Sequence, residues 1–219
     1  MIRPRTALLL TLALAATPAL AQQEISKVNG SITAEADQAY GDLDTVNGSI
    51  RVADGATAED ASTVNGSINV GDKARVDSLE TVNGSIRVGK EVQVRKDVET
   101  VNGSIFTDRG TVVGGKIDTV NGAIGLVETQ LAGGIETVNG DITVGVRSHV
   151  KGGIKVSKPQ GFRLNVKRDP RIIIGPNAIV DGPLVFERPV TLYVHTSAKI
   201  GAVTGATAKP FSTDTAPAE

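Results

Sequence analysis

The chain has 219 residues, among them 25 glycines, no cysteine and no tryptophan, and its 23 Lys and Arg nearly balance its 24 Asp and Glu. This length suffices for one domain with its own hydrophobic core. The lack of cysteine excludes disulfides, thiolate metal sites and thiol nucleophiles from this sequence. Abundant Gly together with Val and Ile favours short strands that are joined by tight turns.

The first 21 residues have the three parts of a secretory signal peptide. Arg3 and Arg5 form a positive start, residues 7–16 are apolar but too short to span a bilayer, and residues 19–21 (Ala-Leu-Ala) match a cleavage site. A buried N-terminal helix is the alternative. We therefore expect export by a Sec-type signal peptide, with cleavage after Ala21, to the periplasm or the cell exterior.

From residue 25 to about residue 145 the chain consists of seven copies of a Val-Asn-Gly-x-Ile motif. The copies follow one another at intervals of 18 or 19 residues, and the Ile is present in every copy. The Asn and Gly residues of the motif are Asn29, Gly30, Asn47, Gly48, Asn65, Gly66, Asn83, Gly84, Asn102, Gly103, Asn121, Gly122, Asn139 and Gly140. A repeat of such constant period predicts a solenoid.

Within each repeat the apolar residues come as three pairs that are separated by gaps. In one well-formed copy the pairs are Ile68 and Val70, Ala74 and Val76, and Leu79 and Val82. Spacing by two within a pair is typical of a strand, and the gaps are typical of corners. Three strands and three corners per 18–19 residues predict an all-β fold, a single-domain parallel β-solenoid with three sides, in which these six side chains point inward.

An antiparallel meander is the alternative fold, because Asn-Gly between apolar residues is the strongest short signal for a hairpin. Parallel coils, however, stack each residue on its equivalent, so that Asn side chains can form a hydrogen-bonded ladder. The identity of residues from copy to copy therefore favours the solenoid. The Asn-Gly pairs become corners, where Gly accepts unusual dihedral angles and Asn tolerates the left-handed region.

Five motif copies read Asn-Gly-Ser and so match the acceptor pattern for N-glycosylation. Ala123 and Asp141 replace the Ser in the last two copies, which fits the needs of a corner better than those of an acceptor site. We therefore interpret these copies as corners.

The repeat resembles the adhesin-type β-solenoid domains of bacteria, a family of unknown function with Val-x-Gly-x-Ile repeats. The resemblance covers residues 25 to about 156 and implies an extracytoplasmic solenoid with adhesion as its role. Residues 172–203 again carry apolar pairs at about six-residue intervals and are similar to bactofilins, the polymer-forming β-helix proteins of bacteria. The spacing of these pairs predicts further coils, and we expect the large side chains of Phe186, Tyr193 and Phe211 to close this end of the rod.

Between these blocks, residues 146–171 lose the motif and carry eight basic residues against one acid, so we expect a divergent coil with a basic insertion. This candidate interaction surface consists of Arg147, Lys151, Lys155, Lys158, Arg163, Lys167, Arg168 and Arg171. The solenoid domain would span residues 22–203. Residues 204–219 are rich in Ala, Thr and Pro and predict a disordered tail.

Two features of charge point to contacts with other molecules. An acidic column and a Thr column precede the motif valines, and we expect both to face solvent at a corner: Asp44-Thr45, Ser62-Thr63, Glu80-Thr81, Glu99-Thr100, Asp118-Thr119 and Glu136-Thr137. Stacked like charges repel, so nearby Lys or Arg, bound cations or a basic partner should balance the acids. The alternative is a soluble ladder that discourages aggregation, and the single Thr column is also a weak signal for ice binding.

The second feature is the uneven distribution of charge along the rod. Residues 22–145 carry a net charge of −9 and residues 146–219 a net charge of +6. A bipolar rod can associate head to tail. Its basic end can also attract anionic polymers of the envelope.

Residues for catalysis are scarce. The two histidines, His149 and His195, are far apart in the sequence, and no nucleophile elbow, phosphate loop or calcium repeat is present. A polysaccharide-active enzyme is the least favoured function, because its paired carboxylates would need long loops and only residues 146–171 could supply one.

We expect an exported, non-enzymatic structural or adhesive repeat protein of the bacterial cell envelope, with a self-assembling polymer-forming scaffold as the alternative. We expect no cofactor, no bound metal, no nucleic acid and no membrane span. An envelope polysaccharide, another protein or a second copy is the expected partner.

Overall fold

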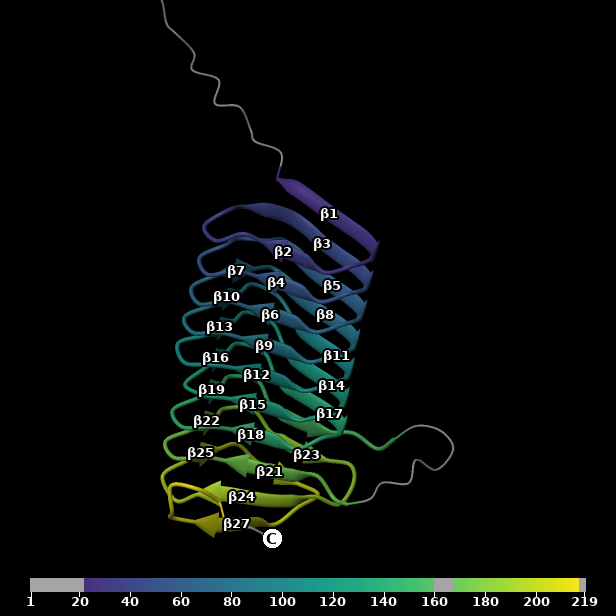
Figure 1. Ribbon diagram of the computed structural model, residues 1–219. Coiled ribbons are helices and arrows are strands. Elements are labelled where there is room, and N and C mark those ends of the chain that lie inside the picture. Colours follow the sequence, from purple (N-terminus) through teal and green to yellow (C-terminus); the bar gives the residue numbers. More distant parts are fainter. Residues whose placement is uncertain (1–21, 160–167, 217–219) are drawn as a thin grey trace, which may run out of the picture.

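The computed structural model describes residues 22–159 and 168–216, and these residues form an all-β solenoid of about ten turns that contains no helix (Figure 1). Three parallel sheets, here called A, B and C, make the three sides. The predicted fold class is thereby confirmed. The predicted signal peptide, residues 1–21, lies outside the described residues.

Each turn contributes one strand to sheet A and one to sheet B, and seven of the turns also contribute a strand to sheet C. The strands follow one another along the chain in the order A, B, C. Sheet A contains β1 (Gln23–Asn29), β3 (Tyr40–Asn47), β5 (Asp60–Asn65), β8 (Ser78–Asn83), β11 (Val98–Asn102), β14 (Ile117–Asn121), β17 (Ile135–Asn139), β20 (Ile154–Val156), β23 (Leu184–Phe186) and β26 (Val203–Thr204). Sheet B contains β2 (Ile32–Ala34), β4 (Ile50–Val52), β6 (Ile68–Val70), β9 (Ile86–Val88), β12 (Ile105–Thr107), β15 (Ile124–Leu126), β18 (Ile142–Val144), β21 (Arg171–Ile174), β24 (Thr191–His195) and β27 (Ala208–Phe211). Sheet C contains β7 (Arg75–Val76), β10 (Gln93–Val94), β13 (Val112–Val113), β16 (Gln130–Leu131), β19 (His149–Val150), β22 (Ile179–Val180) and β25 (Lys199–Ile200).

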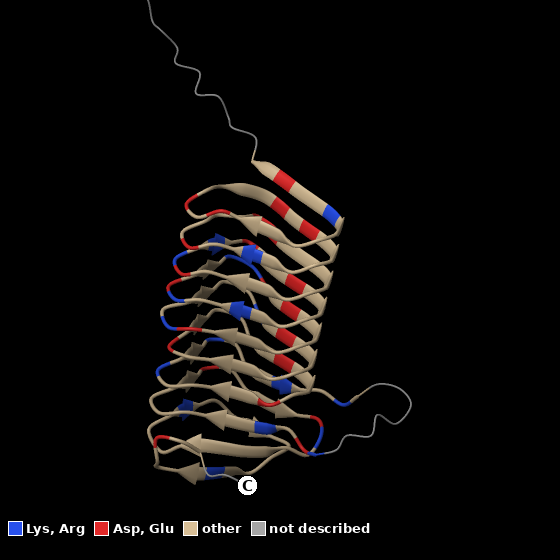
Figure 2. Cartoon of the chain, viewed as in Figure 1, with Lys and Arg blue, Asp and Glu red and all other residues tan. Residues whose placement is uncertain are grey.

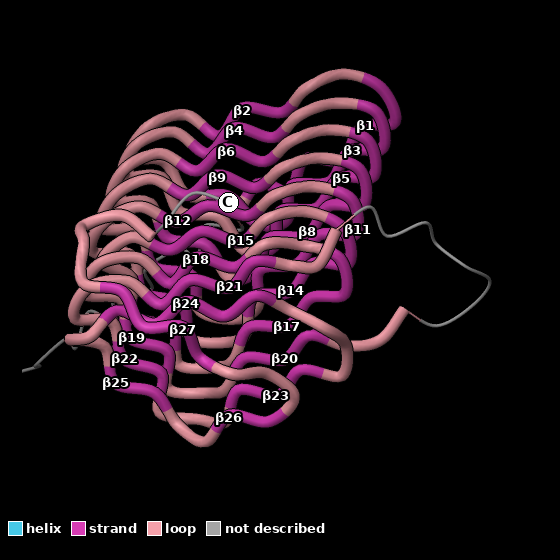
Figure 3. Tube along the Cα trace, turned by 90° about the horizontal axis from the view of Figure 1, so that it is seen from below, coloured by secondary structure: helices cyan, strands magenta, loops and turns pink. Residues whose placement is uncertain are grey.

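Neighbouring turns stack in register, residue upon equivalent residue. Between β8 and β11, for example, Glu80 lies over Glu99, Thr81 over Thr100 and Asn83 over Asn102. All strand pairs are parallel, as expected for a solenoid and contrary to a meander. Figure 3, seen from below, shows successive turns as loops of similar shape, each displaced slightly from the one before it. Identity of residues at equivalent positions thus follows from identity of surroundings.

The core is a set of apolar columns that run the length of the rod. The inward Ile column of sheet B is almost fully buried from Ile32 to Ile172, and Leu, Ile, Val and Ala from the other two sheets complete the interior. Because each side chain is stacked on its equivalent, the columns are continuous, and almost every buried residue contacts the turn above and the turn below. Burial of this apolar surface is the main source of stability in a chain without disulfides.

One predicted column points the wrong way. The motif valines were expected inside and the Thr residues outside, but Val82 is 40% exposed and Thr81 only 4%. The strand alternates without a break from Leu79 inward to Glu80 outward, Thr81 inward and Val82 outward. The same pattern holds for Thr45, Thr63, Thr100, Thr119 and Thr137, which are all buried.

A hydrogen bond between turns explains the buried Thr column. Thr81 Oγ1 donates to the carbonyl oxygen of Gly66 at 2.9 Å, and Thr100 Oγ1 to that of Gly84 at 3.0 Å. The carbonyl belongs to the Gly of the motif in the preceding turn, where the chain bends and cannot use it in a ladder. Thr satisfies this buried acceptor, whereas Val would leave it without a partner.

The Asn-Gly corner needs Gly mainly for space. A Cβ atom on Gly84 would overlap the carbonyl oxygen of Gly66 in the preceding turn, and the same holds from Gly48 to Gly140. Within the motif, only Gly30 and Gly122 have positive φ, and none of the seven motif asparagines does. The expected role of the left-handed region is therefore wrong at most of these corners, and close stacking of the backbones is the reason for the glycine.

The left-handed region is used at the corner between sheets B and C. Six residues other than Gly adopt it, with φ between 44° and 60°: Asp37, Lys73, Glu91, Glu128, Arg147 and Asn177. Gly55 and Gly110 occupy the equivalent position in two other turns. Only Gly adopts this conformation without a steric cost, so each of the other six stores some strain.

The C-terminal part continues the solenoid further than expected. Residues 146–156 are regular through β19 and β20, and the chain leaves the rod only between β20 and β21. The expected disordered tail begins too early, because β27 (Ala208–Phe211) pairs along β24 and buries Phe211. Tyr193 does not close this end: it lies on the outside of sheet B, where Arg171 and Lys209 contact its ring.

Candidate functional site

A shallow groove runs along the outside of sheet A, across β5, β8, β11, β14 and β17. We call it the sheet A groove. Its volume is about 470 Å³, and it is open to solvent. Its outward lining side chains are Val64, Val82, Val101, Val120, Val138, Ser62, Glu80, Glu99, Asp118 and Glu136. An apolar column and an acidic column therefore lie side by side on one regular surface.

The apolar column is unusual because it is exposed. Val64, Val82, Val101 and Val120 are each 39–41% exposed, although each is a β-branched residue in a strand. They point outward because the Thr that precedes each of them is held inside by its bond to a Gly carbonyl. Contiguous exposed apolar side chains of this kind typically mark an interaction surface.

The acidic column shows up as a red stripe on this face in Figure 2. Glu80, Glu99, Asp118 and Glu136 follow one another in register. Adjacent strands are about 4.8 Å apart, so these carboxylates repel one another. One cation lies in the middle of the column: Lys116 Nζ is 3.0 Å from Glu99 Oε1 and 2.5 Å from Asp118 Oδ2.

Burial and the neighbouring charges shift the pKa of one acid of this column, Asp118. Burial raises the pKa of Asp118, Lys116 opposes that effect, and Glu136 and Glu99 raise the pKa further. The pKa of Lys116 is itself raised by its hydrogen bonds to Asp118 and Glu99. Within the described part of the chain, neither Glu80 nor Glu136 forms an ion pair, but Lys155 follows Glu136 in register in the next turn and places a cation at that end of the column.

A ladder of Asn side chains borders the groove at the corner between sheets A and B. Each motif Asn from Asn47 to Asn139 donates from Nδ2 to Oδ1 of the Asn in the preceding turn, at 3.0–3.1 Å throughout. The last acceptor of the ladder is Oδ1 of Asn139. Arg188 Nη1 donates to this oxygen at 2.6 Å and to the Val138 carbonyl oxygen at 3.0 Å. The guanidinium thus ends a chain of aligned amide dipoles at its negative pole.

The six basic residues of this set that the structure describes do not form one patch. Five of them make contacts within the chain: Arg147 with Glu128 at 2.6 Å, Lys155 and the backbone N–H of Lys158 with Glu187 at 3.4 Å and 3.2 Å, and Arg168 and the backbone N–H of Arg171 with Asp141. They lie at different corners and faces around the rod. Arg163 and Lys167 lie outside the described residues.

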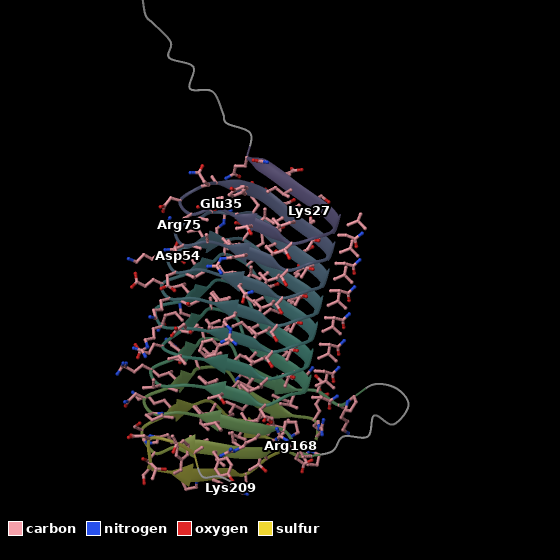
Figure 4. All side chains as sticks on the ribbon, viewed as in Figure 1. Lys27, Glu35, Asp54, Arg75, Arg168 and Lys209 are labelled. Carbon is pink, nitrogen blue, oxygen red and sulfur yellow. The ribbon has the colours of Figure 1, made fainter. Side chains whose placement is uncertain are left out.

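Asp141 anchors the point where the chain returns after the insertion. Burial alone would raise its pKa, but two bonds from Arg168 and one from the Arg171 backbone outweigh it and hold the pKa of Asp141 below its usual value. Asp141 replaces the Ser of the motif in the last copy, so this departure from the repeat marks the insertion. Figure 4 shows Arg168 at this end of the rod and Lys27 at the other.

The two histidines lie on different sheets, His149 in β19 of sheet C and His195 at the end of β24 of sheet B, and each has an ordinary polar partner. His149 Nε2 lies 2.7 Å from Asp181 Oδ2, and His195 Nδ1 lies 2.8 Å from Ser197 Oγ. Among residues 22–159 and 168–216, no cluster of three or more His, Asp or Glu side chains could hold a metal ion. The described residues also contain no helix that is long and apolar enough to cross a membrane.

The acidic column can be predicted from the sequence, but the groove cannot be predicted from apolar spacing. That spacing places the valines in the core, which leaves no apolar surface beside the acids. The available signal was the unbroken alternation from Leu79 to Val82, which places Leu and Thr on one face and Glu and Val on the other.

Comparison with known proteins identifies no relative of this chain. No family model, no curated protein and no solved structure matches the chain. The fold itself is a parallel β-solenoid of about ten turns.

Proposed function

We propose that this chain is an exported, non-enzymatic structural or adhesive protein of the bacterial cell envelope, and that the sheet A groove is the surface with which it holds its partner. The observation that carries the proposal is the column of four valines, each 39–41% exposed, in register beside the acidic column. The resemblance of the repeat to adhesin-type solenoids agrees with this role.

The chemistry of the groove selects the kind of partner. Its acidic column repels anionic polysaccharides, and its valines offer nothing to a sugar hydroxyl. A polypeptide segment with alternating basic and apolar side chains matches both columns, since successive side chains of an extended chain also alternate. A protein partner is therefore preferred over an envelope polysaccharide at this face.

Self-assembly into a filament is less well supported at the C-terminal end. In sheet B, the N–H groups of alternate residues donate to the next turn. In β4, for example, Ile50 donates to the Ser67 carbonyl, and Val52 points its N–H in the same direction. Pro210 is the residue of β27 that is equivalent to Val52, and β27 is the last strand of sheet B. Because proline has no N–H, the free edge of this sheet lacks one hydrogen-bond donor. Proline and Lys209 on an edge strand both discourage the addition of another strand.

A defined peptide tests the proposal. A fluorescent peptide of alternating Lys and Val is titrated with residues 22–219, with the Glu80→Lys/Glu136→Lys double variant, and with the Val82→Ser/Val101→Ser double variant. We expect saturable binding to the wild type that weakens with salt, and at least a tenfold loss in both variants. Gln93→Lys on sheet C is the control. Equal binding by all four proteins, or none by the wild type, would refute the groove as the binding surface.

A further inference from the structure

All seven Asn-Gly pairs can undergo spontaneous deamidation of the Asn side chain, and the fold determines how readily each pair reacts. The backbone nitrogen of Gly can lose its proton to solvent and attack Cγ of the preceding Asn. The new Cγ–N bond closes a succinimide ring, the Cγ–Nδ2 bond breaks, and Nδ2 leaves as ammonia after taking up a proton. Water then opens the ring to aspartate or isoaspartate. Gly favours this attack because it has no side chain to hinder it.

Six of the seven Gly nitrogens are held in hydrogen bonds. Each donates its N–H to the backbone carbonyl of the Asn in the next turn, at 2.9–3.1 Å: Gly30, Gly48, Gly66, Gly84, Gly103 and Gly122. A nitrogen that donates in this way points at the next turn and away from its own Asn side chain. At these six positions the attack requires that a bond between turns be broken first.

The seventh pair lacks this bond. Asn139-Gly140 is the last copy of the motif, and in the next turn the chain leaves the rod after β20, so no Asn carbonyl lies beneath Gly140. In the described part of the chain the N–H of Gly140 has no hydrogen-bond partner. The neighbouring Thr137 departs from the repeat as well, because its buried Oγ1 makes no hydrogen bond while the equivalent Thr residues bond to a Gly carbonyl.

Among the described residues, a cation lies at the reacting side-chain carbonyl of this pair and at that of no other motif Asn. Arg188 Nη1 is 2.6 Å from Asn139 Oδ1, the oxygen on which negative charge develops when the ring closes. A donor placed at a developing oxyanion lowers the barrier to its formation. From the free Gly140 nitrogen and the Arg188 contact together, we infer that Asn139 is a site of spontaneous modification, and that it reacts ahead of the other six asparagines.

The products differ in their effect on the rod. Aspartate at position 139 ends the Asn ladder in a carboxylate beside Arg188, which forms an ion pair. Isoaspartate lengthens the backbone by one carbon at the corner where neighbouring turns stack most closely. Either product adds negative charge next to the insertion.

The test compares seven sites within one molecule. Folded residues 22–219 are incubated at mildly alkaline pH, and peptides are mapped by mass spectrometry that separates aspartate from isoaspartate. Loss of one net hydrogen bond corresponds to a factor of roughly 2 to 10, so Asn139 should react faster than each other motif Asn by at least that factor. Equal rates at the seven sites, or a faster reaction at any other one, would overturn the inference.

Two controls separate the fold from the local sequence. In denaturant the seven pairs lose their different surroundings, and their rates should converge; a preference for Asn139 that persists there would come from sequence alone and would also overturn the inference. Arg188→Gln should slow the reaction at Asn139 and leave Asn47 to Asn121 unchanged. An unchanged or faster rate in that variant would remove the role assigned to the guanidinium.

Discussion

The inward direction of the Thr column can be tested with substitutions at two neighbouring residues, one whose side chain points into the core and one whose side chain points to solvent. Thr100 is 5% exposed and donates to the Gly84 carbonyl at 3.0 Å, whereas Val101 is 41% exposed. Thr100→Val keeps the shape but leaves a partly buried carbonyl without this donor, which costs about 1 kcal/mol of unfolding free energy. Val101→Thr changes an exposed side chain and should stay within about 0.5 kcal/mol of wild type.

The column provides its own matched control. Thr137 is 2% exposed, yet its Oγ1 makes no hydrogen bond. Thr137→Val therefore removes a buried hydroxyl that has no partner and should be neutral or slightly stabilising. The contrast between Thr100→Val and Thr137→Val isolates the hydrogen bond from the change in shape and hydrophobicity.

Urea denaturation followed by far-ultraviolet circular dichroism measures these differences. Repeat proteins can unfold in parts, so the slope of the transition must agree among variants before midpoints are converted into free energies. If Val101→Thr cost about 1–3 kcal/mol and Thr100→Val cost nothing, the valine would be the inward residue, as the apolar pairs of the sequence suggested. The assignment of the sheet A groove would then fail as well.

Three further predictions concern a corner, an end and the insertion. Glu91 has φ 56°, so Glu91→Gly should raise the unfolding free energy by up to about 1 kcal/mol in thermal denaturation, while a destabilised Gly variant or an equal gain from Glu91→Ala would argue against strain. Pro210→Val should restore the missing donor on the edge of sheet B and produce larger species with increasing concentration in sedimentation velocity; a monomer at all concentrations would show that Pro210 is not what limits association. The pKa of Asp141 is lowered in the folded state, so its contribution is complete above the unfolded value, near 3.8, and is lost as pH falls through the folded value. Asp141→Asn should therefore lower the denaturation midpoint at neutral pH and have no effect in strong acid, and a pH-independent effect would contradict the charge-based account.

The period of the sequence was enough to predict the architecture. Seven copies at intervals of 18 or 19 residues, with Asn, Gly and Ile unchanged, fit only an arrangement that stacks equivalent residues. Parallel pairing and the Asn ladder followed from that identity. The coils of the C-terminal block were also predictable, because the pairs Ala178 and Val180, and Leu184 and Phe186, keep the spacing of the repeat after the motif itself is lost.

The direction of Val82 could not be deduced from apolar spacing alone. Leu79 and Val82 are three residues apart, and a corner between them would place both inside, whereas a straight strand places Thr81 inside instead. The decision rests on the carbonyl of Gly66, which belongs to the preceding turn and needs a donor.

The sequence by itself determined which residues stack on one another, since a constant period needs no knowledge of contacts. Only the tertiary structure decided what those stacks expose and protect. The Asn139 amide meets Arg188, forty-nine residues later, at the corner between β23 and β24. Within the described residues the Gly140 N–H has no hydrogen-bond partner, since in the other six copies the Asn of the following turn supplies that partner.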